Sequence, residues 1–435
     1  MLTPDIAERH LLSSLTDLER YRACVDYGIR GEYFTAHRPV WDFISQYYEE
    51  YRQPPESDLF QSKFPDFELT NCLPIDPCIN EIVTIHTHSK VIGYLKSKLG
   101  GKTSALNENP REFVRQTLKF LSEVEFEQTK RSHSVFDHDP TNRLLRYYDK
   151  VEKNQKSGIF GISTGFPTLD GLFYGWKPGE FISIIARLGL GKSWLLSYFA
   201  LQAFHTGKRV LFVSPEMSKE QVEDRLDTIY SYMLRGQAVQ NSMLSFGRGI
   251  DASVYEQYLK SIKNEDRFHI YDSDLRQPFT VRSITDMVET IRPDMVVVDG
   301  VPLLAPDFST GSATHWEDFK VISYGLKRLA ETMKVVVMAA SWANREAGVD
   351  PNSKQRTTDL SLHPTIEQIS YSDAIGQASD MAFSIALPKD PAERKTSRTI
   401  KMLKSRSTKL MEGLIKIDFD VENGIIKENT AFSGD

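Results

Sequence analysis

The sequence predicts an α/β fold, in which a mostly parallel sheet is flanked by helices and preceded by an all-helical segment. From Ile159 onward, short apolar runs alternate with helical segments. These runs are FISIIA, RVLFVS, FHIYD, MVVVDG, VVVMAASWA and MAFSIAL, followed by RTIKMLKSR and LIKIDFD. Such alternation is typical of a parallel sheet covered on both faces. Between Ala7 and Glu127, apolar residues recur three and four positions apart, which predicts about six helices separated by proline-bearing breaks.

Length and composition indicate a soluble protein of two or three domains. The chain has 435 residues, of which 40% are hydrophobic and 26% charged. Its three cysteines show no C-x₂-C spacing, so neither a disulfide framework nor a zinc site is expected, and the compartment should be reducing. The start, MLTPDIAERH, lacks a signal pattern, and no apolar run approaches the roughly 18 residues that span a bilayer. We therefore expect a cytoplasmic protein without a membrane segment. A net charge of −6 excludes a wholly basic nucleic-acid coat, but one positive groove could still bind DNA.

Shifts in composition divide the chain into three parts. We expect a helical N-terminal domain over residues 1–130, a linker over 131–158 and an α/β domain over 159–435. The linker begins with polar RSHSVFDHDPTN and continues as one amphipathic helix, LLRYYDKVEKN. The apolar residues of this helix must be buried, either in their own chain or against a neighbouring subunit. These residues are Leu144, Leu145, Tyr147, Tyr148 and Val151.

The stretch FISIIARLGLGKSWLLSYFA predicts a strand, a phosphate-binding loop and a helix. Its loop has the GxxxxGK[ST] spacing, with alanine in place of the first glycine. Gly189 and Gly191 let the backbone approach phosphate oxygens, Lys192 would reach the β- and γ-phosphates, and Ser193 would ligate Mg²⁺. The alternative is a chance loop, but the flanking strand and helix favour binding of ATP with Mg²⁺. The predicted nucleotide-binding residues are Ala186, Arg187, Leu188, Gly189, Leu190, Gly191, Lys192, Ser193 and Trp194.

Two further strand ends carry acids that could serve a phosphate site. MVVVD ends at Asp299, which we expect to hold the Mg²⁺ bound by Ser193; the alternative is an aspartate that begins a turn. VLFVSPE ends at Glu216, which could orient and polarise the water that attacks a γ-phosphate. Alternatively, Glu216 complements the dipole of the next helix. Since ligands bind at the carboxyl ends of parallel strands, both acids should lie near the phosphate loop.

Lys404 and Arg406 lie late in the domain and alternate along a predicted strand, so that they point the same way. Phosphoryl transfer needs positive charge on its transition state, and a neighbouring subunit often supplies it. The alternative is a solvated edge strand that positive charge protects from pairing.

Further stretches follow the phosphate loop in order. They are VLFVSPEMSKEQVEDRL, MVVVDGVPLL, LKRLAETMKVVVMAASWANREA, AIGQASD and LKSRSTKL. Together with GISTGFPTLDGLFYGWKPGEF before the loop, they resemble the successive motifs of the DnaB-type hexameric replicative DNA helicases. The Ala-Arg start of the loop is similar to that family's form. AERHLL and FTAHRPVWDFI resemble its helical N-terminal domain more loosely, and LLRYYDKVEKN falls where its linker helix packs on the adjacent subunit.

The resemblance implies a homo-hexameric ring with RecA-like cores, which hydrolyses ATP at subunit interfaces and moves 5′→3′ on single-stranded DNA. A primase and a helicase loader are implied partners. Lys192 and Ser193 then bind phosphate and metal, Glu216 activates water, and Asp299 coordinates Mg²⁺. The matching trans-acting cations are Arg406 and Lys404.

The resemblance also implies pore loops at residues 306–314 and 350–372. In the second, Lys354 and Arg356 are candidate contacts to DNA phosphates, and the alternative is a solvated loop.

Three departures from the family pattern stand out. Trp342 replaces the γ-phosphate-sensing Gln, and Leu188 replaces the usual loop proline. Where the family has a basic, glycine-bearing DNA contact, this chain has SYSD, so Tyr371 or backbone amides would have to substitute. Such drift suits a bacteriophage or otherwise divergent member. A RecA-like ATPase of another use, in recombination or regulation, and a weakly hydrolysing scaffold subunit are the alternative functions.

Overall fold

The computed structural model describes most of the chain as two compact units, residues 1–143 and 144–435. The residues described are 4–51, 53–70, 75–99, 109–127, 143–145, 147–148, 150–152, 159–249, 251–262, 265–272, 278–307, 315–343, 359–364 and 374–430. No helix within these ranges is both long and apolar enough to cross a bilayer.

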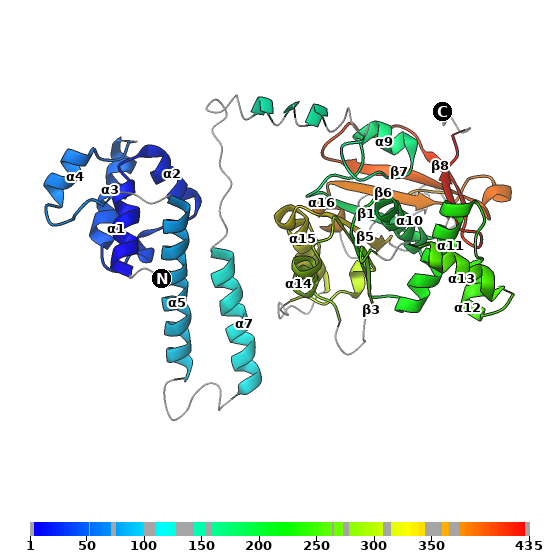
Figure 1. Cartoon of the computed structure of the whole chain (residues 1–435), viewed down its shortest axis with the longest axis horizontal. Coiled ribbons are helices and arrows are strands. Elements are labelled where there is room, and N and C mark those ends of the chain that lie inside the picture. The colour runs from blue at the N-terminus through cyan, green and yellow to red at the C-terminus, as the bar shows by residue number, and fades with distance from the viewer. Residues whose placement is uncertain are drawn as a thin grey trace, which may run out of the picture. The chain divides into compact units, whose positions relative to one another are not determined.

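The first unit is entirely helical in its described part (Figure 1). Its elements are α1 (Pro4–Ser14), α2 (Leu18–Asp26), the 3₁₀ helix η1 (Gly31–Tyr33), α3 (Arg38–Tyr51), α4 (Ser57–Lys63), α5 (Ile75–Leu99) and α7 (Pro110–Glu127). Trp41 and Phe60 lie in its buried core. The Glu8 carboxylate accepts backbone N–H groups of residues 35–37, which fixes the entry to α3 on α1. The predicted all-helical segment is therefore confirmed.

The second unit is built on one nine-stranded sheet with the order β3-β2-β4-β5-β1-β6-β7-β8-β9. The strands are β1 (Phe181–Ala186), β2 (Val210–Ser214), β3 (Phe268–Asp272), β4 (Met295–Asp299), β5 (Val336–Trp342), β6 (Met381–Ala386), β7 (Ser397–Ser405), β8 (Ile415–Asp420) and β9 (Ile425–Glu428). The first six strands of this order run parallel, and β7, β8 and β9 continue the sheet antiparallel. The mostly parallel sheet is confirmed, whereas β9 was not predicted.

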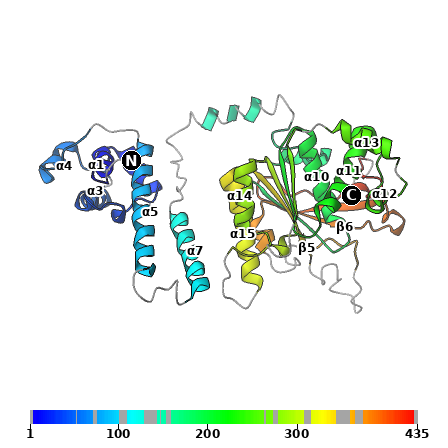
Figure 2. The same cartoon turned by 60° about the horizontal axis from the view of Figure 1, so that its bottom comes forward.

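Helices cover both faces of this sheet (Figure 2). One face packs against α9 (Pro167–Phe173), α10 (Lys192–His205) and α11 (Lys219–Arg235). The other face packs against α14 (Val281–Ile291), α15 (His315–Met333) and α16 (Ala374–Ala378). Strands β1, β2 and β4 are buried throughout, because both of their faces are covered. Two shorter helices, α12 (Asn241–Phe246) and α13 (Ala252–Ser261), follow α11.

The two ends of the parallel strands differ chemically. We call the side of the sheet where these strands end the carboxyl edge, and the side where they begin the amino edge. The carboxyl edge carries the phosphate loop after β1, Glu216 after β2 and Asp299 at the end of β4. The amino edge carries Asp380, which precedes β6 and exchanges hydrogen bonds with Phe181 at the start of β1. Five residue steps along β1 separate these edges, which is roughly 17 Å at about 3.3 Å per residue.

Substitution of Trp176 would measure how much the core next to β1 stabilises this unit. Its indole is fully buried and packs edge to face on Phe199 and Phe383, with ring centroids 5.5 and 5.6 Å away. Trp176→Ala should lower the free energy of unfolding by about 3–5 kcal/mol, because it leaves a large cavity. Urea denaturation measures the change. Trp176→Phe is the matched control and should lose markedly less, since it keeps a ring and removes an indole N–H that has no partner within the described chain. Equal losses would contradict this account.

Candidate functional site

The phosphate loop connects β1 to α10 and is formed by glycines with left-handed backbone. Gly189 and Gly191 have φ of 78° and 98°, and Gly191 is the N-cap of α10. The buried Lys192 ammonium donates to the carbonyl oxygens of Ala186 at 3.3 Å and Arg187 at 3.4 Å. The loop thus wraps around the lysine at a helix N-terminus, which is the geometry that binds phosphate. Within it Ala186 and Leu190 are buried, whereas Leu188 is 73% exposed at the tip.

The carboxylate of Asp299 is buried beside this loop. Its Oδ2 atom has no hydrogen-bond partner among the described residues. The pKa of Asp299 is raised to about 6, mainly by burial and also by the charge of Glu216, while a hydrogen bond with Ser193 and the charges of Arg225 and Lys192 act in the opposite direction. An unpartnered carboxylate oxygen next to a hydroxyl suits Mg²⁺, which prefers hard oxygen ligands. Ser193 and Asp299 therefore fit the ion that the sequence predicts.

Glu216 lies next to Asp299 although it comes from another strand. A Cβ atom built on Gly300, directly after Asp299, would lie 3.7 Å from Glu216 Oε2. Glu216 is solvent-exposed and precedes Ser218, the N-cap of α11, by two residues. It therefore lies outside the first turn of that helix, which argues against the helix-dipole alternative.

Arg225 is a site residue that the sequence analysis missed. It lies on α11, with its guanidinium carbon 5.3 Å from the ring centroid of Trp194. Burial lowers its pKa, and the charges of Asp299 and then Glu216 oppose that shift, so the cation faces both acids. Trp194 thereby links the first turn of α10 to α11. Arg225 is one of two cations, with Lys219, in the stretch EMSKEQVEDR that begins at Glu216, and the order of residues alone does not indicate which of them packs on Trp194.

Residues of the antiparallel strands β7 and β8 pack against the phosphate loop. The buried Phe419 ring of β8 lies against Gly191, and a Cβ atom on this glycine would lie 2.5 Å from its Cζ. Arg398 of β7 stacks on Phe419 with 5.0 Å between guanidinium carbon and ring centroid. Its Nε donates to the carbonyl oxygen of Leu190 at 3.2 Å. Only glycine fits at position 191, because both the contact and the positive φ exclude a side chain.

Lys404 and Arg406 lie at the opposite edge of the sheet. In the register of β6 and β7, Lys404 pairs with Ala382 near the start of β6, and the Arg406 amide donates to Asp380. The roughly 17 Å between the edges is longer than either side chain, so these cations cannot reach the phosphate loop of their own chain. β8 pairs with β7 only over Ser397–Ile400, so the part of β7 that carries Lys404 has a neighbouring strand on one side only, as the edge-strand alternative expects.

Comparison with known families agrees with this arrangement. The family described as DnaB-like helicase C terminal domain matches residues 161–423, more than half of the chain. The chain belongs to this family.

The DnaB-like match extends to curated relatives and solved structures. The chain is 28% identical over 267 residues to "Replicative DNA helicase DnaB" of Mycoplasma genitalium, covering 57% of this chain and 54% of that protein. It is 29% identical over 240 residues to the Pasteurella multocida protein of that name, covering 52% and 49%. The chain thus spans about half the length of these relatives. A "Probable replicative DNA helicase" of Trieres chinensis is 24% identical, covering 83% of this chain and 82% of that protein.

The similar solved structures show the fold. "The Structure Of A DnaB-Like Replicative Helicase And Its Interactions With Primase" has a TM-score of 0.60 at 18% identity, covering 97% of this chain and 99% of that chain. A second structure, described as an ATPase domain, has a TM-score of 0.55 at 21% identity, covering 67% of this chain and 99% of that one.

Some of the predicted residues of this DnaB-like chain cannot be placed. Lys354, Arg356 and Tyr371 lie outside the described residues, as does most of the segment 306–314. Trp342, the departure from the family's Gln, is described. It ends β5 in register with Ala186, directly beside the start of the phosphate loop. Trp342 therefore stands at the strand end where the resemblance implies contact with the γ-phosphate.

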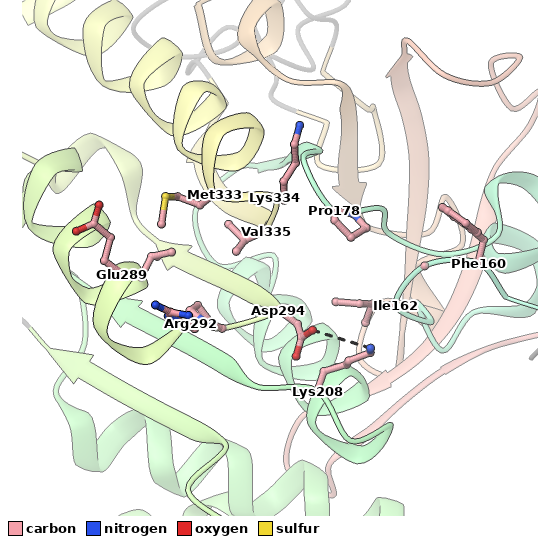
Figure 3. Close-up of a pocket in the computed structure, with 13 residues that line it drawn as sticks. Phe160, Ile162, Pro178, Lys208, Glu289, Arg292, Asp294, Met333, Lys334 and Val335 are labelled. Carbon is pink, nitrogen blue, oxygen red and sulfur yellow. Dashed lines mark ion pairs between the residues drawn. The ribbon is translucent and has the colours of Figure 1, made fainter. Parts of the chain in front are cut away.

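A pocket of about 530 Å³ opens at the other edge of the sheet (Figure 3). Its wall includes Pro178, Asp294 and Val335, which precede β1, β4 and β5. Lys208 forms an ion pair across it with Asp294, at 3.9 Å. Since none of its lining residues belongs to the phosphate loop or the carboxyl ends of the strands, this pocket is not the nucleotide site.

Asp299→Asn should stabilise the nucleotide-free protein. The raised pKa means that the folded state holds an extra proton between pH 3.8 and about 6, so wild-type stability falls as the pH rises through this window. A neutral side chain avoids this loss of folding stability, which is at most about 3 kcal/mol at pH 7. Urea unfolding at pH 7 and pH 4 measures the difference, which should shrink at the lower pH. A variant that is less stable than wild type at pH 7 would contradict this expectation. In the variant, Mg²⁺ should also no longer strengthen nucleotide binding.

Proposed function

We propose that this protein is a replicative DNA helicase that couples ATP hydrolysis to movement on single-stranded DNA as a homo-hexameric ring. The observation that carries the proposal is the separation of the two halves of a phosphoryl-transfer site. Lys192, Ser193, Glu216 and Asp299 gather at the carboxyl edge of the sheet, while Arg406 lies at the amino edge. A complete site then requires the amino edge of a second subunit, and repetition of such a heterologous contact gives a ring when the rotation between subunits closes.

Each residue of the proposed site has its own role in ATP hydrolysis. The loop from Ala186 to Gly191 holds the phosphates with its amides, and Lys192 neutralises them. Ser193 and Asp299 would hold Mg²⁺, which supplies positive charge to the β- and γ-phosphate oxygens when bound. Glu216 orients the attacking water and accepts its proton. Arg406 and Lys404 of the adjacent subunit stabilise the charge that develops on the transferred group.

The proposed assembly also accounts for the linker. Leu144, Leu145, Tyr147 and Tyr148 are each at least half exposed, so the described part of the chain does not bury them. In the proposed arrangement, 1–130 is the N-terminal domain, 131–158 the linker, and 159–435 the ATPase. The linker helix packs on the adjacent subunit.

The proposed partners follow from the relatives. Single-stranded DNA passes through the ring, with Lys354, Arg356 and Tyr371 as candidate contacts. Since a similar structure is titled for its interactions with primase, a primase is a proposed partner, as is a helicase loader. We place the protein in the cytoplasm, which would be the host's if a bacteriophage encodes it.

Strand separation distinguishes this function from the alternatives. ATPase activity is measured with and without single-stranded DNA, and unwinding on a forked duplex. A helicase shows both activities, and DNA stimulates the ATPase. Full ATPase activity without unwinding favours a RecA-like ATPase of another use. The lack of both favours a scaffold, for which Trp342 at the strand end is the specific motive.

Arg406→Ala should abolish ATP hydrolysis while nucleotide binding is kept. Loss of a trans-acting arginine lowers kcat by about 10³–10⁵. Lys409→Ala is the control, because Lys409 is a nearby cation that is 84% exposed. Titration of a fluorescent nucleotide and steady-state turnover measure the two effects. Unchanged turnover of Arg406→Ala would refute the trans assignment.

A further inference from the structure

Asp380 is a nearly buried residue whose carboxylate and backbone carbonyl group together contact four groups. Its Oδ2 atom accepts the Phe181 amide at 2.8 Å and pairs with Lys327 of α15 at 2.5 Å. Its Oδ1 atom faces Nη1 of Arg406 at 3.5 Å, and its backbone carbonyl oxygen accepts the Arg406 amide at 2.9 Å. The side chains of Asp380 and Lys327 are 12% and 13% exposed. The carboxylate is therefore fixed from two sides before it meets Arg406.

The end of α16 holds the same two cations by a second set of contacts. Lys404 donates its ammonium to the carbonyl oxygens of Gly376 at 2.7 Å and Gln377 at 2.8 Å. Arg406 donates Nη2 to the Gln377 carbonyl oxygen at 2.7 Å. Both side chains thus converge on the last turn of one short helix, where unpaired carbonyl groups carry partial negative charge.

A β-bulge in β7 directs Lys404 to this helix. Ala382 pairs with Lys404 and Phe383 with Met402, so Leu403 is an additional residue in β7. In a regular strand Lys404 would share the face of Met402, which packs against α10. The extra residue turns Lys404 to the face of Ala382, which is the face that α16 covers. Bulges often re-aim a side chain next to an active site.

Arg406 keeps part of its guanidinium available despite these contacts. Its side chain is 48% exposed, and the bonds to Asp380 and Gln377 involve only two of its five N–H groups. Held on one side and open on the other, the group is oriented outward in advance. Orientation in advance raises the rate of a reaction, because less conformational freedom is lost when the transition state forms.

We propose that Asp380 is a positioning residue for the trans-acting pair, which it orients toward the nucleotide of the adjacent subunit through its contact with Arg406. Lys327 and the Phe181 amide hold the carboxylate in place for this task. The inference rests on the proposed function, since it requires a nucleotide at the amino edge. The competing explanation is that Asp380 only stabilises the packing of α15 on the sheet.

The test replaces the buried ion pair as a unit. In Lys327→Met/Asp380→Asn, both charges are removed together, so no unpaired buried charge remains, and Asn can still accept the Phe181 amide. We expect kcat for ATP to fall by about 10- to 100-fold with single-stranded DNA present, while KM for ATP stays within about twofold of wild type. Glu331→Gln is the matched control, because Glu331 pairs with Lys327 at 3.0 Å but is 60% exposed. It should leave kcat unchanged.

Subunit mixing separates positioning from stability. The double variant is mixed with Glu216→Gln subunits, whose Arg406 is intact. Each intact Arg406 should complete the site of an adjacent double-variant subunit, so the mixture should exceed the activity of both parents. A mixture that never exceeds its parents overturns the proposal, as does a double variant with wild-type kcat.

Two more variants, Asp380→Glu and Arg406→Ala, distinguish failure of the proposed role of Asp380 from failure of the proposed trans site. If the double variant does not assemble, Asp380→Glu is used instead, which keeps the charge but displaces it by one methylene; unchanged kcat then overturns the proposal. Arg406→Ala is measured in parallel. If Arg406→Ala turns over like wild type, the proposed trans site itself fails. If it is inactive while the double variant is normal, only the role of Asp380 fails.

Discussion

The length of the parallel strands sets the distance between the phosphate loop and the residues at the opposite ends of the strands, and the arrangement of the candidate site depends on this distance. Strand β1 places the phosphate loop at one edge of the sheet and Phe181, with Asp380, at the other. Because six strands run in parallel, Asp299 at the end of β4 and Glu216 just beyond β2 lie on the same side of the sheet as the loop, whereas Asp380, which precedes β6, lies at the opposite ends of the strands. In the proposed assembly, each subunit therefore offers one incomplete site at either end of its parallel strands. The proposed sharing of sites between subunits follows from this polarity more directly than from any single residue.

The carboxyl edge gathers charges that a stable fold would avoid. Lys192 is buried, and its pKa is lowered by burial, against which Glu216 and Asp299 act. Asp299 leaves one oxygen without a partner in the described chain, and Arg225 balances the acids without a direct ion pair. Such a cluster is strained when no ligand is bound, so it stabilises the protein less than apolar residues would. The buried apolar strands beneath it offset that loss.

Short-range patterns in the sequence were enough to predict the strands, the loop and the acids at the strand ends. Apolar runs bounded by Gly, Asp and Pro locate β1, β2 and β4, because both faces of these strands are covered and their residues need no alternation. Arg225 and Asp380 were missed for a physical reason. Each acts through partners distant in sequence, as Arg225 does with Trp194 and Asp380 with Lys327. The bulge at Leu403 was also missed, since nothing in the order KMLKSR marks an additional residue.

Strand β7 connects the two incomplete sites. Near its start, Arg398 donates to the carbonyl oxygen of Leu190 in the phosphate loop of its own subunit. Beyond its bulge it carries Lys404 and leads to Arg406, the cations proposed for the adjacent subunit. Between these points, β7 pairs with β6 from Thr399 to Ser405 and with β8 from Ser397 to Ile400. The antiparallel extension thus joins the loop of one proposed site to the cations of the next.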